Sequence, residues 1–273
     1  MLTARFDDGK PKRKGRGRRS RRKQPNPVNE VECRALADDL IELILLDSGI
    51  LDHFGPIAKH RNNYSEYGEL IQNLIDGRLY NEEDAGRTNL AFMKKLQLAH
   101  QGYVSKQKIW SQAMGLITEM AFLGLMHRKY DIHSKKIYHE HIATVSNETS
   151  ECGMDRKPID VIMWCDCNKN GEFLEIKKNL KNKIEIVKNG EEPGLVEKIK
   201  LMYGMLSFLH ENDSKSSIVG LATLSKNPFA IRLVEVSLQE AGVLGSQEEI
   251  DSLEYQMTVI TSDDVVEWYT NVI

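Results

Sequence analysis

Apolar residues recur with two different periods along the chain, and the period changes near residue 104. Before that point they fall every three or four positions, which is typical of amphipathic helices. These helices are expected at 31–46, near 64–76 and at 82–100, with a break at 47–56 where glycine and proline interrupt the pattern. We therefore expect an all-helical region over residues 29–104.

After residue 104, a long helical stretch is followed by short apolar runs that have strand character. The expected order is helix, three strands, helix and strand, and the tight turn "NKNG" joins the second and third strands. These elements are expected at 105–130, 136–143, 158–166, 171–178, 194–210 and 216–224, followed by a helix near 228–240, a strand at 255–261 and a helix at 262–269. The pattern predicts an α/β domain over residues 105–273.

The N-terminal end differs in composition from the rest of the chain. Residues 1–25 contain eleven lysines and arginines against two aspartates, a net charge of +9, so the remaining 248 residues carry −12. Like charges at this density repel one another and oppose packing. We therefore expect a disordered basic arm over residues 1–28, ending at the prolines of "QPNPVNE".

The basic arm is expected to contact nucleic acid, because lysine and arginine neutralise phosphates. The residues expected to do so are Lys12, Arg13, Lys14, Arg16, Arg18, Arg19, Arg21, Arg22 and Lys23. A nuclear-import signal, or a tail that only solubilises the chain, has the same composition, so both stay open as alternatives.

Composition also predicts an intracellular protein without membrane contact. No apolar run approaches the ~20 residues that span a bilayer, and no apolar segment follows the basic N-terminus as it does in a secretory signal. The four cysteines are too few and too unevenly spaced for a disulfide scaffold. We expect a reducing compartment, which is the cytoplasm, or the nucleus if the host is eukaryotic.

A carboxylate and a lysine lie two residues apart in the third expected strand, within "FLEIKKN". Because side chains alternate along a strand, Glu175 and Lys177 should emerge on the same face. Asp160 opens the preceding strand, and antiparallel pairing would bring it near them. Glu119 lies in "GLITEMAFLGLM", where burying an unpaired carboxylate would be costly. A strand with solvated surface salt bridges is the alternative.

These residue types suit a hard cation. Mg²⁺, or Mn²⁺ in its place, takes oxygen ligands and is usually held by one or two carboxylates. Asp160 and Glu175 would supply the carboxylates and the Ile176 carbonyl a third oxygen, with Glu119 supporting the site. Lys177 would orient or deprotonate the attacking water, or stabilise the transition state. The set predicts hydrolysis of a phosphodiester bond.

The sequences "PID" at 158–160 and "EIK" at 175–177 resemble the motif of the PD-(D/E)XK nuclease superfamily. The resemblance covers roughly residues 105–225, which is under half of the chain. Ile159 separates the proline from the motif aspartate, a spacing that varies in the superfamily. The matching positions are Glu119 for the acid on the first core helix, Asp160 for the motif aspartate, and Glu175 with Lys177 for the E-x-K pair.

This resemblance implies a restriction-endonuclease-like fold, with an α-β-β-β-α-β core and a mixed central sheet. It also implies a Mg²⁺-dependent endonuclease, acting on DNA more often than on RNA, in restriction, defence or a mobile element. Members often place a further polar residue on the helix after the motif strand. Lys198, Lys200 and Tyr203 all fit that position, and the sequence does not choose among them.

Other interpretations stay open. A binding or assembly subunit could use the same fold without catalysis and depend on its basic arm alone. The helical region could recognise substrate, bind a partner protein or form a homodimer. A zinc site is a weaker alternative, because His139 and His141 on one strand and Cys165 and Cys167 on the next supply the ligand types of tetrahedral zinc.

Overall fold

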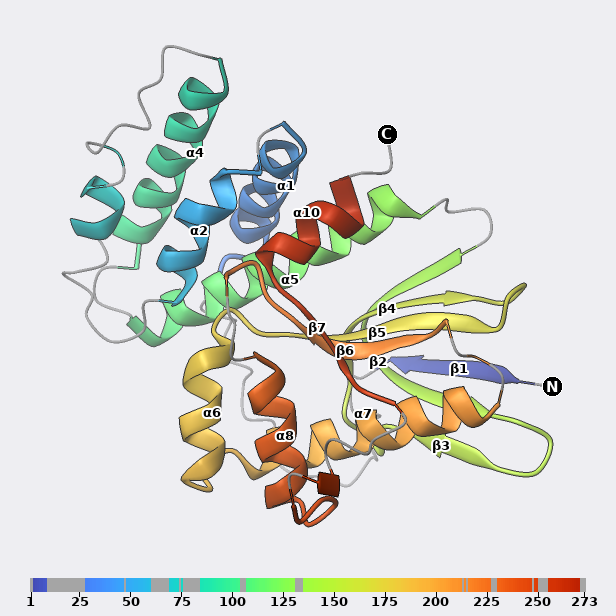
Figure 1. Cartoon of the computed structure of the whole chain (residues 1–273). Helices are drawn as coiled ribbons and strands as arrows, with labels where there is room; N and C mark the ends of the chain where they lie inside the picture. The colour runs from blue at the N-terminus through green and yellow to red at the C-terminus, as the bar shows by residue number, and fades with distance from the viewer. Residues whose placement is uncertain are drawn as a thin grey trace, which may run out of the picture.

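The computed structural model shows an α/β protein with a mixed sheet between layers of helices (Figure 1). It describes residues 2–8, 28–46, 48–59, 69–73, 75, 84–103, 107–130, 135–212, 214, 216–226, 230–246, 248–249 and 255–270. The expected α/β class and mixed sheet are thereby confirmed.

The helices and strands follow one another along the described chain in the order given next. They are β1 (Thr3–Asp8), α1 (Glu30–Leu46), α2 (Ile50–Lys59), α4 (Asp84–Gln101), α5 (Gln107–Lys129), β2 (Lys135–Ser146), β3 (Glu151–Gly153), β4 (Ile159–Cys165), β5 (Asn170–Ile176), α6 (Leu180–Lys188), α7 (Pro193–Glu211), β6 (Ile218–Ala222), α8 (Ala230–Glu240), β7 (Thr258–Ile260) and α10 (Ser262–Thr270).

Within the described residues, seven strands form one sheet in the order β1-β2-β4-β5-β6-β7, and β3 also pairs with β2. Pairing is antiparallel from β1 to β5 and parallel from β5 to β7. The three expected motif-region strands are β2, β4 and β5. The short strand β3 and the helix α6 were not expected, since neither has an extended apolar pattern in the sequence.

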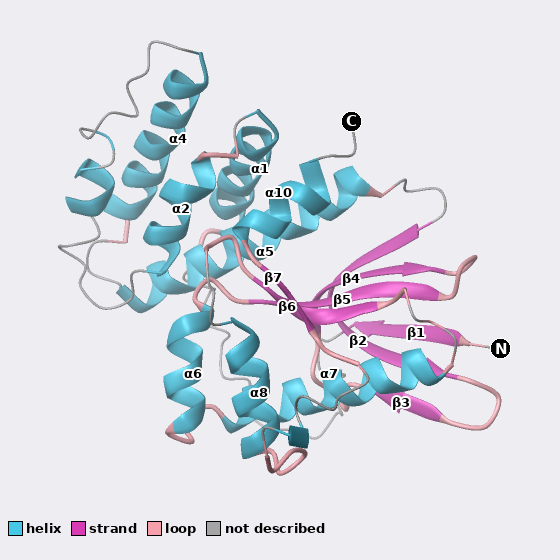
Figure 2. Cartoon of the chain, viewed as in Figure 1, coloured by secondary structure: helices cyan, strands magenta, loops and turns pink. Residues whose placement is uncertain are grey.

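One face of the sheet packs against α5, α10 and the helical region (Figure 2). On β4 and β5 the residues facing this side are Val161, Met163, Leu174 and Ile176. The helical region shares the same core, because α1 packs directly on α5. A Cβ added at Gly124 of α5 would overlap the terminal methyl group of Ile41 of α1, so a larger residue at this position would require the Ile41 side chain to move.

The opposite face packs against α6, α7 and α8. The alternate residues of the same strands, among them Ile162, Trp164 and Phe173, are buried here. Both faces of β4 and β5 are therefore covered, which explains why these strands read as nearly continuous apolar runs. A polar side chain on either strand must find its partners inside the protein.

The structure corrects the expected disorder of the basic arm at its first residues. Residues 3–8 form β1, an edge strand that pairs antiparallel with β2 from Thr3 opposite Ser146 to Asp8 opposite His141. Leu2 is buried, and Phe6 stacks on Tyr138 with ring centroids 4.4 Å apart. The charge of the segment concealed this apolar alternation. The nine expected phosphate-binding residues, from position 12 to position 23, lie outside the described residues.

The expected break at 47–56 is also wrong over most of its length. Helix α2 begins at Ile50 and includes Pro56. Ile50, Phe54 and Ile57 are fully buried at helical spacing, so tertiary packing outweighs the local cost of glycine and proline. The expected helix near 64–76 is described only in part, at 69–73 and 75.

Within the described residues, one helix is long and apolar enough to cross a membrane by length and composition alone, the stretch Ile109–Lys129 of α5. Half of its apolar window is buried against the rest of the protein. Core helices of soluble proteins have the same character, so the expected lack of membrane contact stays a prediction.

Candidate functional site

Asp160 and Glu175 meet because β4 and β5 form an antiparallel hairpin. Val161 lies opposite Leu174, and Ile162 lies opposite Phe173. Continuing this register by one residue places Asp160 opposite Glu175, on the face covered by α7. Two carboxylates fifteen residues apart in sequence thus become cross-strand neighbours.

The Asp160 carboxylate is fixed by the backbone of β5. Its Oδ2 accepts a hydrogen bond of 2.7 Å from the Ile176 N–H and lies 3.4 Å from the Lys177 Nζ. Its Oδ1 lies 3.6 Å from the Nζ of Lys198, which comes from α7. The side chain is 14% exposed, so these partners replace most of its water.

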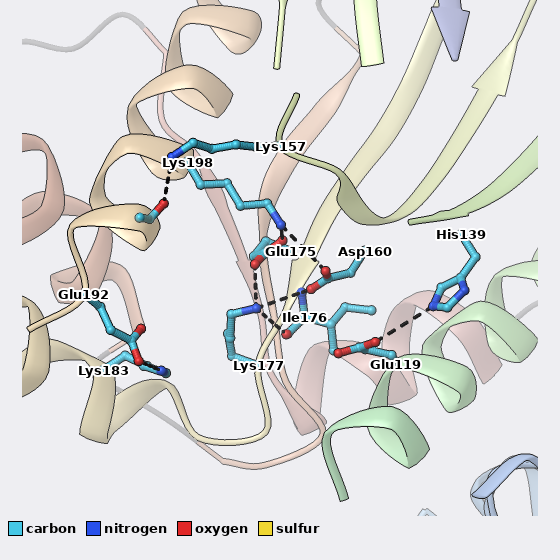
Figure 3. A network of polar contacts seen from close by, with 11 residues as sticks. Glu119, His139, Lys157, Asp160, Glu175, Ile176, Lys177, Lys183, Glu192 and Lys198 are labelled. Atoms are coloured by element: carbon cyan, nitrogen blue, oxygen red, sulfur yellow. Dashed lines mark hydrogen bonds and ion pairs between the residues drawn. The ribbon is translucent and has the colours of Figure 1, made fainter. Parts of the chain in front are cut away.

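Glu175 is the most buried member of the group, at 3% exposure, and Figure 3 shows it between Lys177 and Lys198. The Lys177 Nζ donates to its Oε1, and the Lys198 Nζ pairs with its Oε2. Lys177 also donates to the carbonyl oxygen of Ile176 at 3.0 Å. Glu175 and Lys177 do share one side of the strand, and the network contains two carboxylates and two ammonium groups.

The electrostatics of the group depend on this pairing. Burial alone would raise the pKa of Asp160, but Lys177, Lys198 and the Ile176 N–H together hold that pKa below its usual value. Burial raises the pKa of Glu175, although Lys177 and Lys198 act in the opposite direction. Burial would lower the pKa of Lys177, yet Glu175 and Asp160 more than offset it and raise that pKa. Lys177 is therefore protonated near neutral pH.

Glu119 lies on the other side of the sheet. It projects from α5 toward His139 of β2, with 3.8 Å between Oε2 and Nε2, which is an ion-pair distance rather than a hydrogen bond. Burial raises the pKa of Glu119, while the neighbouring Glu119 raises the pKa of His139. The charges of Asp160 and Lys177 also act on Glu119. The structure brings Glu119 close to the site but leaves it outside the set that Lys177 contacts.

Two further lysines, each paired with its own glutamate, lie at the periphery of the group (Figure 3). Lys157 pairs with Glu197 of α7, and Lys183 of α6 pairs with Glu192, the residue before α7. Their side chains are 24% and 17% exposed. Partly buried ammonium groups at the edge of a carboxylate site are suited to hold an anionic ligand.

The oxygen set fits a hard divalent cation. Three oxygens of different groups, the carboxylates of Asp160 and Glu175 and the carbonyl of Ile176, converge on a single nitrogen, the Nζ of Lys177. They are the expected metal ligands, and their donor types are those that Mg²⁺ takes. The Lys177 ammonium shows that these oxygens stabilise a positive charge at this position. Among the described residues, no three His, Cys, Asp or Glu side chains gather closely enough to hold a metal by themselves.

The alternative zinc set is not brought together. His139 and His141 of β2 lie opposite Val161 and Ile159, at one end of the β2–β4 pair. Cys165 lies opposite Lys135 at the other end, six residues along the strand, which corresponds to roughly 20 Å. No single ion can contact both pairs.

The sequence offered three polar residues on the following helix, and Lys198 is the one that the structure shows paired with Asp160 and Glu175. Leu195, Ile199 and Met202 mark the buried face of α7, and Lys198 lies on that face. The position of a lysine within this apolar stripe is the sequence signal that could have identified Lys198. Lys200 is exposed on the same helix and lines a different hollow. Lys157 and Lys183 were missed because neither belongs to a recognisable motif.

Comparisons of this chain with protein families, with curated proteins and with solved structures gave no match. The resemblance to the nuclease superfamily therefore rests on the residues and their geometry.

Proposed function

We propose that this protein is a metal-dependent endonuclease of the PD-(D/E)XK type, which hydrolyses phosphodiester bonds in nucleic acid and prefers DNA. One observation carries the proposal. Asp160, Glu175 and the Ile176 carbonyl, from two adjacent strands, converge on one buried cationic position, which the Nζ of Lys177 occupies.

Asp160, Glu175 and the Ile176 carbonyl would hold Mg²⁺, or Mn²⁺ in its place. When bound, the metal lowers the pKa of an attached water and screens the charge that develops on the phosphate. Lys177 holds a protonated ammonium beside those oxygens, which suits it to orient the attacking water and to stabilise negative charge in the transition state. Glu119, which pairs with His139 on the opposite face of the sheet, would add negative charge near the metal ligands.

The place where the chain leaves β1 supports this proposal. Residues 12–23 follow β1, whose last residue, Asp8, lies opposite His141, and His141 in turn lies opposite Ile159. Adjacent strands are about 4.8 Å apart, so the chain leaves β1 roughly 10 Å from the start of β4, where Asp160 lies. The basic run would bind phosphates of the substrate next to the proposed site.

The alternative is a nucleic-acid-binding subunit without catalysis. Lys177 and Lys198 already neutralise both carboxylates, so the network is satisfied as an ion-pair cluster. This alternative predicts that nucleic-acid binding depends on the basic run and is indifferent to Glu175 and Lys177.

A nuclease assay separates the two functions. Plasmid DNA, single-stranded DNA and RNA are incubated with the protein in Mg²⁺, in Mn²⁺ and in EDTA, and the wild type is compared with Glu175→Gln and Lys177→Met. Glu172→Gln is the matched control, because Glu172 is an equally buried glutamate of β5 on the opposite face.

We expect metal-dependent cleavage that Glu175→Gln and Lys177→Met abolish and Glu172→Gln retains, with all four proteins folded by circular dichroism. Cleavage that survives both site substitutions would refute the residue assignment. If no substrate is cut under any condition but nucleic acid is bound, the subunit without catalysis is the better account.

A further inference from the structure

Lys198 and Lys177 divide the oxygens of the two carboxylates between them. Lys198 pairs with Oδ1 of Asp160 and Oε2 of Glu175, while Lys177 pairs with Oδ2 of Asp160 and Oε1 of Glu175. Two negative and two positive charges thus alternate in a closed ring (Figure 3). The ring is neutral, and each carboxylate oxygen has a cationic partner.

The two lysines are not held equally. Lys177 adjoins the strand and has a third acceptor in the carbonyl of Ile176. Lys198 reaches the ring from α7 at the end of a long side chain, and within the described residues its ion pairs are with Asp160 and Glu175. A lysine side chain has a flexible four-carbon stem that ends in a compact ammonium group. The ammonium of Lys198 can therefore change partner while α7 stays in place.

Charge balance sets the consequence for a metal ion. A divalent cation that enters the neutral ring meets two ammonium groups as well as two carboxylates, which opposes binding. If Lys198 leaves, the ring keeps one net negative charge and frees one oxygen of each carboxylate. A phosphodiester carries the negative charge that a displaced ammonium requires, and charge-assisted contacts of lysine with phosphate are strong.

We propose that Lys198 is an exchangeable counter-cation, held by Asp160 and Glu175 until a substrate phosphate takes it, so that nucleic acid and metal bind cooperatively. This inference rests on the proposed function, since it assumes that the same carboxylates hold the metal. The neighbouring ammonium groups of Lys157 and Lys183 would extend the surface that receives the phosphate. By linkage, each ligand raises the affinity for the other by the same factor.

The test measures metal binding directly. Mn²⁺ is titrated into the full-length protein with electron paramagnetic resonance detection of free Mn²⁺, with and without a DNA duplex carrying hydrolysis-resistant phosphorothioate linkages. The variants are Lys198→Met and Lys198→Ala, with Lys136→Met as the control, because the ion pair of Lys136 with Asp166 lies at the end of the β2–β4 pair that is far from Asp160. Glu175→Gln defines which bound Mn²⁺ belongs to the site, and thermal melts verify folding.

We expect DNA to raise the Mn²⁺ affinity of the wild type about tenfold or more, within the usual range of coupling between sites. Lys198→Met and Lys198→Ala should bind Mn²⁺ about tenfold tighter than the wild type without DNA, and DNA should then change that affinity little. Lys136→Met should behave as the wild type does.

Two results overturn the inference, and they differ in what else they reject. If Glu175→Gln removes Mn²⁺ binding while the Lys198 variants match the wild type with and without DNA, Lys198 is not an exchangeable counter-cation and the proposed metal site stands. If no protein binds Mn²⁺ in a manner that Glu175→Gln removes, with or without DNA, the proposed function fails together with this inference.

Discussion

Strand β5 carries two glutamates three residues apart, Glu172 and Glu175, and both are 3% exposed. Because three is an odd number, they lie on opposite faces of the sheet. Glu172 faces α5 and α10, where its Oε1 accepts from the Lys129 Nζ at 3.1 Å and from the hydroxyl of Tyr130. Its Oε2 accepts a hydrogen bond of 3.1 Å from the hydroxyl of Tyr269.

The partners of Glu172 define a structural cluster. Lys129 lies within 4.8 Å of the ring centroids of Tyr130 and Tyr269 and 5.5 Å from that of Trp268, so it is enclosed by aromatic faces. Neutral hydroxyls and one ammonium satisfy a single carboxylate, and the contacts tie α5 and α10 to β5.

Glu175 differs in the chemistry of its partners, although its burial is the same. It faces a second carboxylate, Asp160, and its side-chain partners are ammonium groups rather than hydroxyls. Burial of an acid therefore does not distinguish a site from a structural cluster in this protein. The convergence of two carboxylates on one cationic position is the feature that separates the proposed site from the Glu172 cluster.

The comparison is tested most strongly by Asp160→Asn. The amide oxygen of asparagine can still accept from the Ile176 N–H, so the strand contact is kept and only the negative charge is lost. We expect the rate of DNA cleavage to fall about a thousandfold, since a charge at the reacting centre is removed. Cleavage rates are measured on plasmid DNA, and a thermal melt near that of the wild type verifies the fold. A rate within tenfold of the wild type would show that the charge of Asp160 is not used.

Glu172→Ala should lower the stability of the protein and leave its cleavage rate nearly unchanged, which is the reverse of the result expected for Asp160→Asn. It leaves the Lys129 ammonium and the hydroxyls of Tyr130 and Tyr269 without their acceptor in a buried region. We expect the free energy of unfolding to fall by about 3 kcal/mol, the scale for breaking a buried pair. Urea unfolding measures this loss. The cleavage rate of the folded fraction should stay within about threefold of the wild type, because the cluster lies across the sheet from the site. A large loss of rate at unchanged stability would contradict the distinction.

Alkaline pH should also lower the free energy of unfolding through the Glu172 cluster, by less than Glu172→Ala does. Burial, followed by the charge of Glu172, raises the pKa of both Tyr130 and Tyr269 above the ordinary value of 10.0. The unfolded chain therefore releases these protons first, and the stabilisation present below pH 10 is lost as the pH rises above it.

For each of these tyrosines, the free energy of unfolding should fall by about 1.4 kcal/mol for every pH unit above 10. Tyr269→Phe removes one titrating group and should make this slope shallower by the same amount. Unfolding by urea at pH 8 to 11 measures both slopes, and equal slopes in the two proteins would exclude Tyr269 as a source of the pH dependence.

The sequence was most informative where the residues of the candidate site follow a local pattern. The period of two placed Glu175 and Lys177 together, and the order of strands placed Asp160 opposite them. Lys198 could not be chosen over Lys200 or Tyr203 from the sequence, because its role depends on how α7 crosses the sheet. That crossing is set by tertiary packing, which a local pattern does not contain.

The errors have a common physical cause. Residues 3–8 were assigned to a disordered arm because their charge outweighed their alternation, although pairing with β2 supplies the backbone hydrogen bonds of a strand. Helix α2 was missed because Pro56 and the adjacent glycine are poor helix formers, and burial of Phe54 and Ile57 compensates. In both cases distant partners outweighed local propensity.

The pairing of β1 with β2 means that the basic run is anchored on both sides. Before it, Asp8 is fixed in the sheet, and after it Val28 is buried and the Asn29 N–H bonds to the hydroxyl of Tyr103 at 3.2 Å. A residue eight positions beyond Asp8, such as Arg16, stays within roughly 28 Å of it by chain length alone.

One guanidinium confined to that reach has an effective concentration on the order of ten millimolar near the sheet edge. Deleting residues 1–25 would remove a strand along with the charges, so it would confuse loss of folding with loss of phosphate binding. Replacing the basic residues between positions 12 and 23 while keeping residues 1–8 changes only the local concentration of positive charge.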